Sequence, residues 1–275
     1  IGLGHVGAHV AFILGVLGIA DEVKLCEVKS EKLVSERQDM MDAVMFMPHR
    51  VNYTIASYEE LADCDVIVNA IGDITLCASG NRDDEMHFTV PQVADYIPKV
   101  MAGGFQGIII NITNPCDVVT ETGLDHHSFS AYMMGEHGNS QIVPWSLIKF
   151  GGKSLAELEQ NPAYVFDKAR VQDETIHAGW VTYSGKHCTE YGISMTAATM
   201  VRAVLRDERK IMAASAPLDG EYGETGIFCG VPSVIGANGI EEVIEYNLPE
   251  QEMKDFKACC ATIRANIAKA EEFWK

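Results

Sequence analysis

The segment IGLGHVGAHVAFILGVLG, residues 1–18, decides the fold of the first half of the chain. Gly2, Gly4 and Gly7 form the pattern G-x-G-x-x-G, which leads directly into an apolar segment with helical periodicity. Glycines let the backbone turn tightly and approach a pyrophosphate, and the N–H groups of the following helix N-terminus favour an anion. The residues that we predict to bind a dinucleotide in this loop are Gly2, Gly4, His5, Val6 and Gly7.

Glu27 supports the same interpretation. A β-rich run at residues 23–28 follows the helix, and it carries Glu27 twenty positions after Gly7. A carboxylate at this place accepts hydrogen bonds from both hydroxyls of an adenosine ribose and repels a 2′-phosphate. The alternative is a close-packed glycine turn without a ligand, but loop, helix, strand and acid together favour a nucleotide site. We therefore predict NAD, rather than NADP, as the cofactor.

The periodicity of the first half predicts a parallel sheet. Short β-rich runs alternate with longer helical stretches; the runs are 23–28, 51–56, 65–71 and 107–112, and the stretches are 6–17, 30–45 and 85–101. Such alternation is typical of α/β proteins with right-handed crossovers. We predict a Rossmann-type doubly wound parallel sheet over residues 1–121. Because the glycine loop normally follows a buried strand of about five residues, we also expect sequence to be missing before Ile1.

The second half predicts a different architecture. Long amphipathic stretches at 162–184, 191–207 and 250–273 surround a glycine-rich β region at 220–239. This pattern indicates an α+β substrate domain over residues 122–275.

The amino-acid composition limits which partners the protein can bind and where in the cell it is expected. The formal net charge of −18 makes nucleic acid and anionic lipid unsuitable partners. No apolar run approaches the roughly 18 residues of a membrane span. The eight cysteines contain no C-x-x-C pair, which favours buried thiols in a cytoplasmic protein over a disulfide framework. An anionic substrate would have to meet a locally placed cation.

His137 is the candidate acid/base residue. It lies in MGEHGNS, residues 134–140, after an apolar β-run. Flanking glycine leaves room for a substrate, and imidazole exchanges protons near neutral pH while a carbonyl and an alcohol interconvert. The alternative is a structural histidine with satisfied hydrogen bonds. The adjacent pair His126 and His127 has no ligand spacing around it, and we predict no metal site.

Two polar residues stand where a sheet of this kind binds ligands. Asn114 follows the strand at 107–112, at the carboxyl edge, where its amide could donate to a substrate oxygen. Arg82 lies in a polar, glycine-bearing loop before a helix, which fits a lid that carries charge over a substrate. The alternatives are a plain strand-ending turn and a surface arginine paired with the neighbouring acids.

Several ordered motifs resemble one family. They are the glycine loop, Asn114-Pro115-x-Asp117, GEHG at 135–138, LRDE at 205–208, LDGEYG at 218–223 and GVPxVIG at 230–236. Together they are similar to the L-lactate/L-malate dehydrogenase superfamily, and most similar to its L-lactate and L-2-hydroxyisocaproate dehydrogenase branch. The resemblance implies an NAD-dependent enzyme that interconverts 2-oxo acids and L-2-hydroxy acids, assembled as a homo-oligomer (a dimer or tetramer).

The resemblance also implies residue roles. His137 matches the acid/base histidine, Asn114 the asparagine that hydrogen-bonds the reacting oxygen, and Arg82 the lid arginine that polarises the carbonyl. Glu27 takes the ribose-binding position. Thr189 matches a threonine of the substrate pocket, and Ile193 is expected to pack on the nicotinamide.

The lid sequence bears on the substrate. Malate-type enzymes need a further arginine before Arg82, and the run DITLCAS at residues 73–79 has none. We predict that Thr75, Leu76 and Cys77 line the pocket and favour a bulky apolar side chain, as in 2-hydroxyisocaproate. The alternative within enzymes is L-lactate dehydrogenase proper.

One departure from the family pattern matters. After Glu121 the chain lacks a family segment that carries an aspartate, which orients the histidine, and an arginine, which grips the substrate carboxylate. We expect this segment to be missing from the sequence as given. If it is truly absent, the chain is a catalytically silent NAD-binding protein, which is the alternative from another class.

Overall fold

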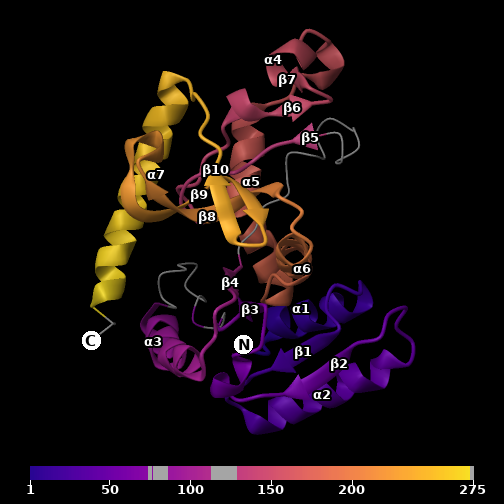
Figure 1. Cartoon of the computed structure of the whole chain (residues 1–275). Coiled ribbons are helices and arrows are strands. Elements are labelled where there is room, and N and C mark those ends of the chain that lie inside the picture. The colour runs from indigo at the N-terminus through magenta and orange to yellow at the C-terminus, as the bar shows by residue number, and fades with distance from the viewer. Residues whose placement is uncertain (74–75, 77–85, 113–128, 273–275) are drawn as a thin grey trace.

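The computed structural model describes residues 1–73, 76, 86–112 and 129–272 (Figure 1). Its helices are α1 (His5–Val16), α2 (Ser30–Val44), α3 (Met86–Gly103), α4 (Leu155–Leu158), α5 (Lys168–Lys186), α6 (Tyr191–Leu205) and α7 (Glu250–Glu271). Its strands are β1 (Glu22–Leu25), β2 (Asn52–Ile55), β3 (Val66–Asn69), β4 (Ile108–Asn111), β5 (Phe129–Ser130), β6 (Lys149–Phe150), β7 (Lys153–Ser154), β8 (Lys210–Asp219), β9 (Thr225–Gly236) and β10 (Gly239–Val243). None of these described helices is both long and apolar enough to cross a membrane.

The first half is parallel α/β structure, as predicted. β1 pairs with β2 and β3 with β4, each in parallel, and each pair is connected through a helix, α2 or α3. The strands are shorter than the apolar runs suggested. β1 ends at Leu25, which pairs with Ile55 of β2, and the carbonyl of the next residue, Cys26, accepts the N–H of Gly2 at 2.9 Å. The predicted domain boundary at 121/122 lies outside the described residues.

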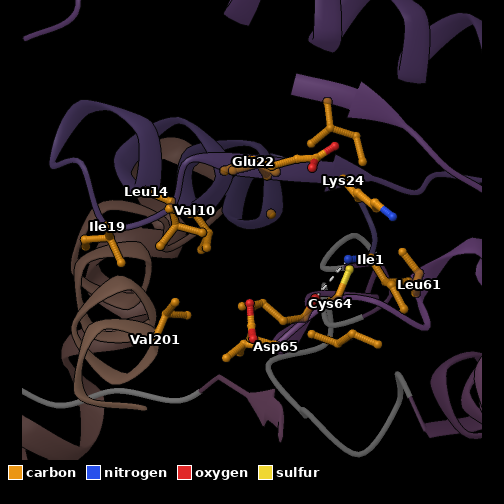
Figure 2. Close-up of a pocket in the computed structure, with 18 of the residues that line it drawn as sticks. Ile1, Val10, Leu14, Ile19, Glu22, Lys24, Leu61, Cys64, Asp65 and Val201 are labelled. Carbon is orange, nitrogen blue, oxygen red and sulfur yellow. Dashed lines mark hydrogen bonds between the residues drawn. The ribbon is translucent and has the colours of Figure 1, made fainter. Parts of the chain in front are cut away.

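A cavity of about 430 Å³ lies between β1 and β3 (Figure 2). Ile1 lies at one end of it, where its amino group donates to the Val68 carbonyl at 2.9 Å and its carbonyl accepts from the Ala70 N–H at 2.9 Å. Val10, Leu14 and other apolar side chains of α1 and α6 contribute to its wall. Residues of β1 and β3 line it, so the cavity separates the two parallel strand pairs β1–β2 and β3–β4.

The second half is built on a three-stranded antiparallel sheet in the order β10–β9–β8, with α7 packed against it (Figure 1). Phe256, Cys259 and Cys260 of α7 are buried against Cys229 of β9. The thiol sulfurs of Cys229 and Cys260 are 4.0 Å apart, and the cysteines in the described part of the chain are free. The glycine-rich region predicted at 220–239 contains the turn after β8, the whole of β9 and the start of β10.

Two local boundaries differ from the sequence expectation. The stretch at 162–184 does not form one helix, because Asp167 accepts a hydrogen bond from the Arg170 N–H at 3.1 Å and so starts α5 at Lys168. The apolar run before His137 forms only the two-residue strand β5, followed by an isolated bridge between Met134 and Ile142.

The two halves share a core in which α6 lies beside α1 (Figure 1). Ala197 and Ala198 are buried there against Val10 of α1, and their small side chains let the helix axes approach closely. The hydroxyl of Ser194, near the start of α6, donates to the Val6 carbonyl in the first turn of α1 at 3.3 Å. This contact brings residues of the second half to the glycine loop.

Candidate active site

The glycine loop has the shape that a pyrophosphate requires. Gly2 has a φ of +81°, and a Cβ at Gly7 would lie 1.9 Å from the Gly2 carbonyl oxygen. A Cβ at Gly4 would meet no atom within 4 Å, so the loop is open at this residue. Gly4 is the N-cap of α1 and provides no side-chain cap, which leaves the first N–H groups of the helix to an anion. These residues fit a dinucleotide.

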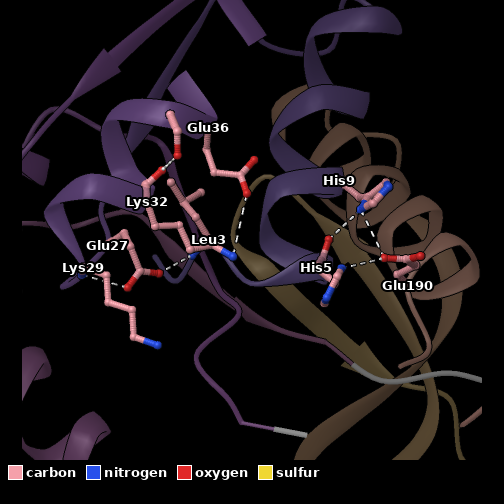
Figure 3. Close-up of polar contacts among 9 residues, drawn as sticks. Leu3, His5, His9, Glu27, Lys29, Lys32, Glu36 and Glu190 are labelled. Atoms are coloured by element: carbon pink, nitrogen blue, oxygen red, sulfur yellow. Dashed lines mark hydrogen bonds and ion pairs between the residues drawn. The ribbon is translucent and has the colours of Figure 1, made fainter. Parts of the chain in front are cut away.

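Glu27 lies against the same loop (Figure 3). One carboxylate oxygen accepts a hydrogen bond from the Leu3 N–H at 2.9 Å, and the other accepts from the Lys29 N–H at 3.0 Å. The end of β1 thus places a carboxylate beside the loop, and the two backbone donors fix its orientation. This geometry fits the predicted ribose-binding role.

The start of α6 forms the opposite side of the loop. Thr189 and Ile193 are both half-buried, and Ser194, next to Ile193, bonds to Val6. The structure therefore brings Val6 and Ile193, both predicted to contact the cofactor, close together. The chain next to Thr189 also carries ionisable side chains that the motifs did not indicate, namely Lys186, Cys188 and Glu190.

Glu190 is the most prominent of these groups (Figure 3). Its carboxylate forms an ion pair with Lys186, and its Oε2 lies 3.3 Å from Nδ1 of His5 and 3.5 Å from Nδ1 of His9. The hydrogen bond from Lys186 is the main cause that holds the pKa of Glu190 below its ordinary value. Sequence spacing could not reveal this cluster, because His5 and Glu190 meet only through the packing of α1 on α6.

His137 belongs to a loop anchored to β9. The neighbouring Gly135 exchanges two backbone hydrogen bonds of 2.9 Å with Gly230, one in each direction. Glu136 accepts from the Ser140 hydroxyl at 2.8 Å, which closes the loop around His137. His137 lines a cavity of about 70 Å³ together with Met133, Gln141 and residues of β8 and β9.

Four predicted site residues, Arg82, Asn114, Thr75 and Cys77, lie outside the described residues. Leu76 is described: it is half-buried, and its N–H donates to the Asp73 carbonyl at 3.0 Å.

A pair of asparagines at the carboxyl edge of the sheet was not predicted. The amide of Asn69 at the end of β3 donates to the Asn111 side chain at the end of β4, with a distance of 2.9 Å. Both residues lie near the carboxyl ends of the predicted strands at 65–71 and 107–112, so their position close to the ligand-binding edge could have indicated them.

Comparison with known proteins agrees with this arrangement. Residues 1–132 match the model of the lactate/malate dehydrogenase NAD-binding domain, and residues 115–274 match that of the lactate/malate dehydrogenase alpha/beta C-terminal domain. The chain is 32% identical to an L-lactate dehydrogenase of Fusobacterium nucleatum, with 99% of this chain and 96% of the relative covered. It is 31% identical to L-lactate dehydrogenase 2 of Listeria monocytogenes, with 98% and 97% covered.

A solved structure has the same fold. The minor L-lactate dehydrogenase of Enterococcus mundtii, in its ligands-bound form, superposes with a TM-score of 0.87 at 27% identity, with 98% of this chain and 96% of that chain covered. The alignment with the Fusobacterium enzyme extends over 308 positions although this chain has 275 residues, so that relative carries residues without a counterpart here.

The NAD-binding domain and the similarity to L-lactate dehydrogenases over nearly the whole chain define an NAD-dependent 2-hydroxy-acid dehydrogenase. The chain belongs to the lactate/malate dehydrogenase family. The predictions of a Rossmann-type fold with an α+β domain, of NAD as cofactor and of an NAD-dependent 2-hydroxy-acid dehydrogenase are thereby confirmed.

Proposed function

We propose that the chain reduces a 2-oxo acid with an apolar side chain to the L-2-hydroxy acid, and catalyses the reverse reaction with the same groups. The observation that carries this proposal is the anchored loop that presents His137 to a small cavity, in a chain of this family. NAD in its reduced form supplies the hydride when bound. His137 donates the proton to the reacting oxygen, and Arg82 and Asn114 stabilise that oxygen.

Glu27 is proposed to select NAD over NADP, and this role is testable. We expect Glu27→Gln to weaken NADH binding about tenfold, because a charge-assisted hydrogen bond to the ribose is lost. Binding of NADPH should weaken less or improve, since a negative charge is removed next to the 2′-phosphate. Dissociation constants measured by fluorescence titration for both nucleotides check this. Asp21→Asn is the matched control, because Asp21 precedes β1 at its opposite end and lines the cavity between β1 and β3.

The side chain of the substrate has two candidates. The relatives are named L-lactate dehydrogenases, which supports pyruvate and lactate. The apolar run around Leu76 and Cys77, with no arginine before Arg82, supports a bulkier 2-oxo acid of the 2-hydroxyisocaproate type. Thr75 and Thr189 complete the proposed pocket.

NADH oxidation separates these candidates when pyruvate, 4-methyl-2-oxopentanoate, phenylpyruvate and oxaloacetate are compared in parallel. We expect turnover with the apolar acids and kcat/KM for oxaloacetate at least about 100-fold lower, because the sequence of residues 73–79 carries no cation for its second carboxylate. A preference for pyruvate would identify the lactate type, and a preference for the branched or aromatic acid would identify the bulky type. NADH binding without turnover on any acid would contradict the proposed reaction.

A cytoplasmic location and a homo-oligomeric assembly, dimer or tetramer, are proposed with this function. The abundance of unpaired thiols supports the first, and the family resemblance supports the second.

A further inference from the structure

Three possible metal ligands of different chemistry meet beside the glycine loop. They are Nδ1 or Nε2 of His5 at the start of α1, Sγ of Cys188 and a carboxylate oxygen of Glu190, the last two directly before α6. One donor atom from each lies within 4.8 Å of the other two. Figure 3 shows the imidazoles of His5 and His9 on one side of the Glu190 carboxylate.

Glu190 provides an independent indication of a ligand. Its side chain is only 8% exposed, and its Oε2 has no hydrogen-bond partner among the described residues. The nearest imidazole nitrogens lie 3.3 and 3.5 Å from Oε2, and Lys186 occupies the other oxygen, Oε1. A buried carboxylate oxygen without a donor is costly, so a cation between Oε2 and the imidazoles would relieve the cost of its burial.

We propose that His5, Cys188 and Glu190 bind a divalent ion of the zinc class. Nitrogen, sulfur and oxygen ligands together suit a borderline ion such as Zn²⁺, whereas Mg²⁺ and Ca²⁺ prefer oxygen alone. Ligand atoms of a tetrahedral zinc site lie about 3.3–3.7 Å apart, as bond lengths of about 2.0–2.3 Å require. The donor atoms lie within 4.8 Å of one another, so they need to converge by about 1.5 Å or less, and rotation of the exposed His5 ring contributes to this movement.

The charge balance also fits. Binding replaces the thiol proton of Cys188, which leaves to solvent, so a thiolate and a carboxylate neutralise the two charges of the ion. The fourth position is filled by water, because Nδ1 of His9 already hydrogen-bonds to the His5 carbonyl at 2.6 Å. His5 is 69% exposed, so the ion has an entry path, while Cys188 and Glu190 are buried behind it.

The site predicts a regulatory effect, which rests on the proposed function of the glycine loop. His5 is part of the loop assigned to the dinucleotide, so an ion that fixes its ring would compete with the nucleotide. Zn²⁺ should then inhibit the dehydrogenase competitively with respect to NADH.

The test is binding of Zn²⁺ and Co²⁺ to the whole chain, followed by competition with a chromophoric chelator and by absorption spectroscopy. We expect one ion per chain and a thiolate-to-Co²⁺ charge-transfer band. Cys188→Ser should abolish the band and weaken binding by more than about 100-fold, since even outer-shell partners change affinity 10–100-fold. Cys64→Ser controls for loss of a half-buried thiol, and His177→Asn controls for a histidine–carboxylate pair, His177–Asp173, with the same 3.3 Å separation but without a thiol.

An unchanged affinity in Cys188→Ser, with the thermal midpoint of the variant preserved, would overturn the proposed site, as would the absence of the band in the unaltered chain. Glu190→Gln provides a second variant with the same two readouts. NADH titration is run separately. If Zn²⁺ binds with the thiolate band and NADH binding is unaffected, the metal site stands and the role of His5 in the dinucleotide loop is wrong. If the chain binds Zn²⁺ but not NADH, the proposed function fails and the metal site does not.

Discussion

His137→Ala is expected to lower kcat by about 10³-fold while the dissociation constant of NADH stays within about twofold of the unaltered value. The reason is that the imidazole is proposed to supply the proton that accompanies hydride transfer, whereas its loop is anchored on β9 and lines a cavity with residues of β8 and β9. Steady-state kinetics with saturating NADH and a fluorescence titration of NADH measure the two quantities independently.

His177→Ala is the matched control for this variant. His177 lies on α5, and its side chain is 53% exposed, so its removal should leave both kcat and NADH binding unchanged. Retained turnover in His137→Ala would show that another group transfers the proton. A loss of NADH binding together with turnover would instead assign His137 a role in cofactor binding or folding.

The second large effect is expected for Gly7→Ala. Its Cβ would lie 1.9 Å from the Gly2 carbonyl oxygen and 3.2 Å from the Ala70 Cβ, so the loop cannot keep its shape. We expect the free energy of unfolding to fall by about 3 kcal/mol, since neither neighbouring backbone can move without breaking the contacts at Ile1 and Gly2. NADH binding should be lost with it. Urea denaturation followed by circular dichroism measures the first effect.

Gly4→Ala separates loop shape from ligand approach. A Cβ at Gly4 meets no atom within 4 Å, and its φ of −64° suits any residue, so stability should stay within about 0.5 kcal/mol of the unaltered chain. The methyl group would nonetheless project into the open side of the loop where the pyrophosphate is proposed to lie. NADH affinity should therefore fall at least about tenfold. An unchanged affinity would place the pyrophosphate elsewhere.

The fold of the first half follows from local patterns, and so it could be predicted. Strands such as β4 (Ile108–Asn111) lie inside apolar runs such as 107–112 because both faces of a parallel sheet are covered. The ends were less predictable, because the pairing of β1 with β2 stops at Leu25 and the next residue, Cys26, instead accepts the N–H of Gly2, 24 positions earlier in the chain. The end of the apolar run before His137 could not be predicted either. Met134 pairs with Ile142 and Gly135 with Gly230, and neither contact has a periodic signature.

In the candidate site, too, the residues placed by local spacing could be predicted and those placed by helix packing could not. The position of Glu27 beside the glycine loop was predictable because one helix and one strand set the distance between them, and its carboxylate lies 2.9 Å from the Leu3 nitrogen; its role in ribose binding stays a prediction. The link between Val6 and Ile193 required knowledge of the family, since it depends on α1 packing on α6. Glu190 could not be predicted at all. Its importance comes from burial and from two histidines at the far end of the sequence.

The anchor between Gly135 and Gly230 also restricts how this enzyme can evolve. A Cβ at Gly135 would lie 2.7 Å from the Cys259 side chain, and one at Gly230 would lie 2.9 Å from the Gly135 carbonyl oxygen. The φ of +101° at Gly135 further excludes other residues. A substitution at position 135, 230 or 259 therefore requires a compensating change at another of these positions. Substitutions in segments outside these three positions can change the substrate range of the pocket. The position of the histidine then stays the same.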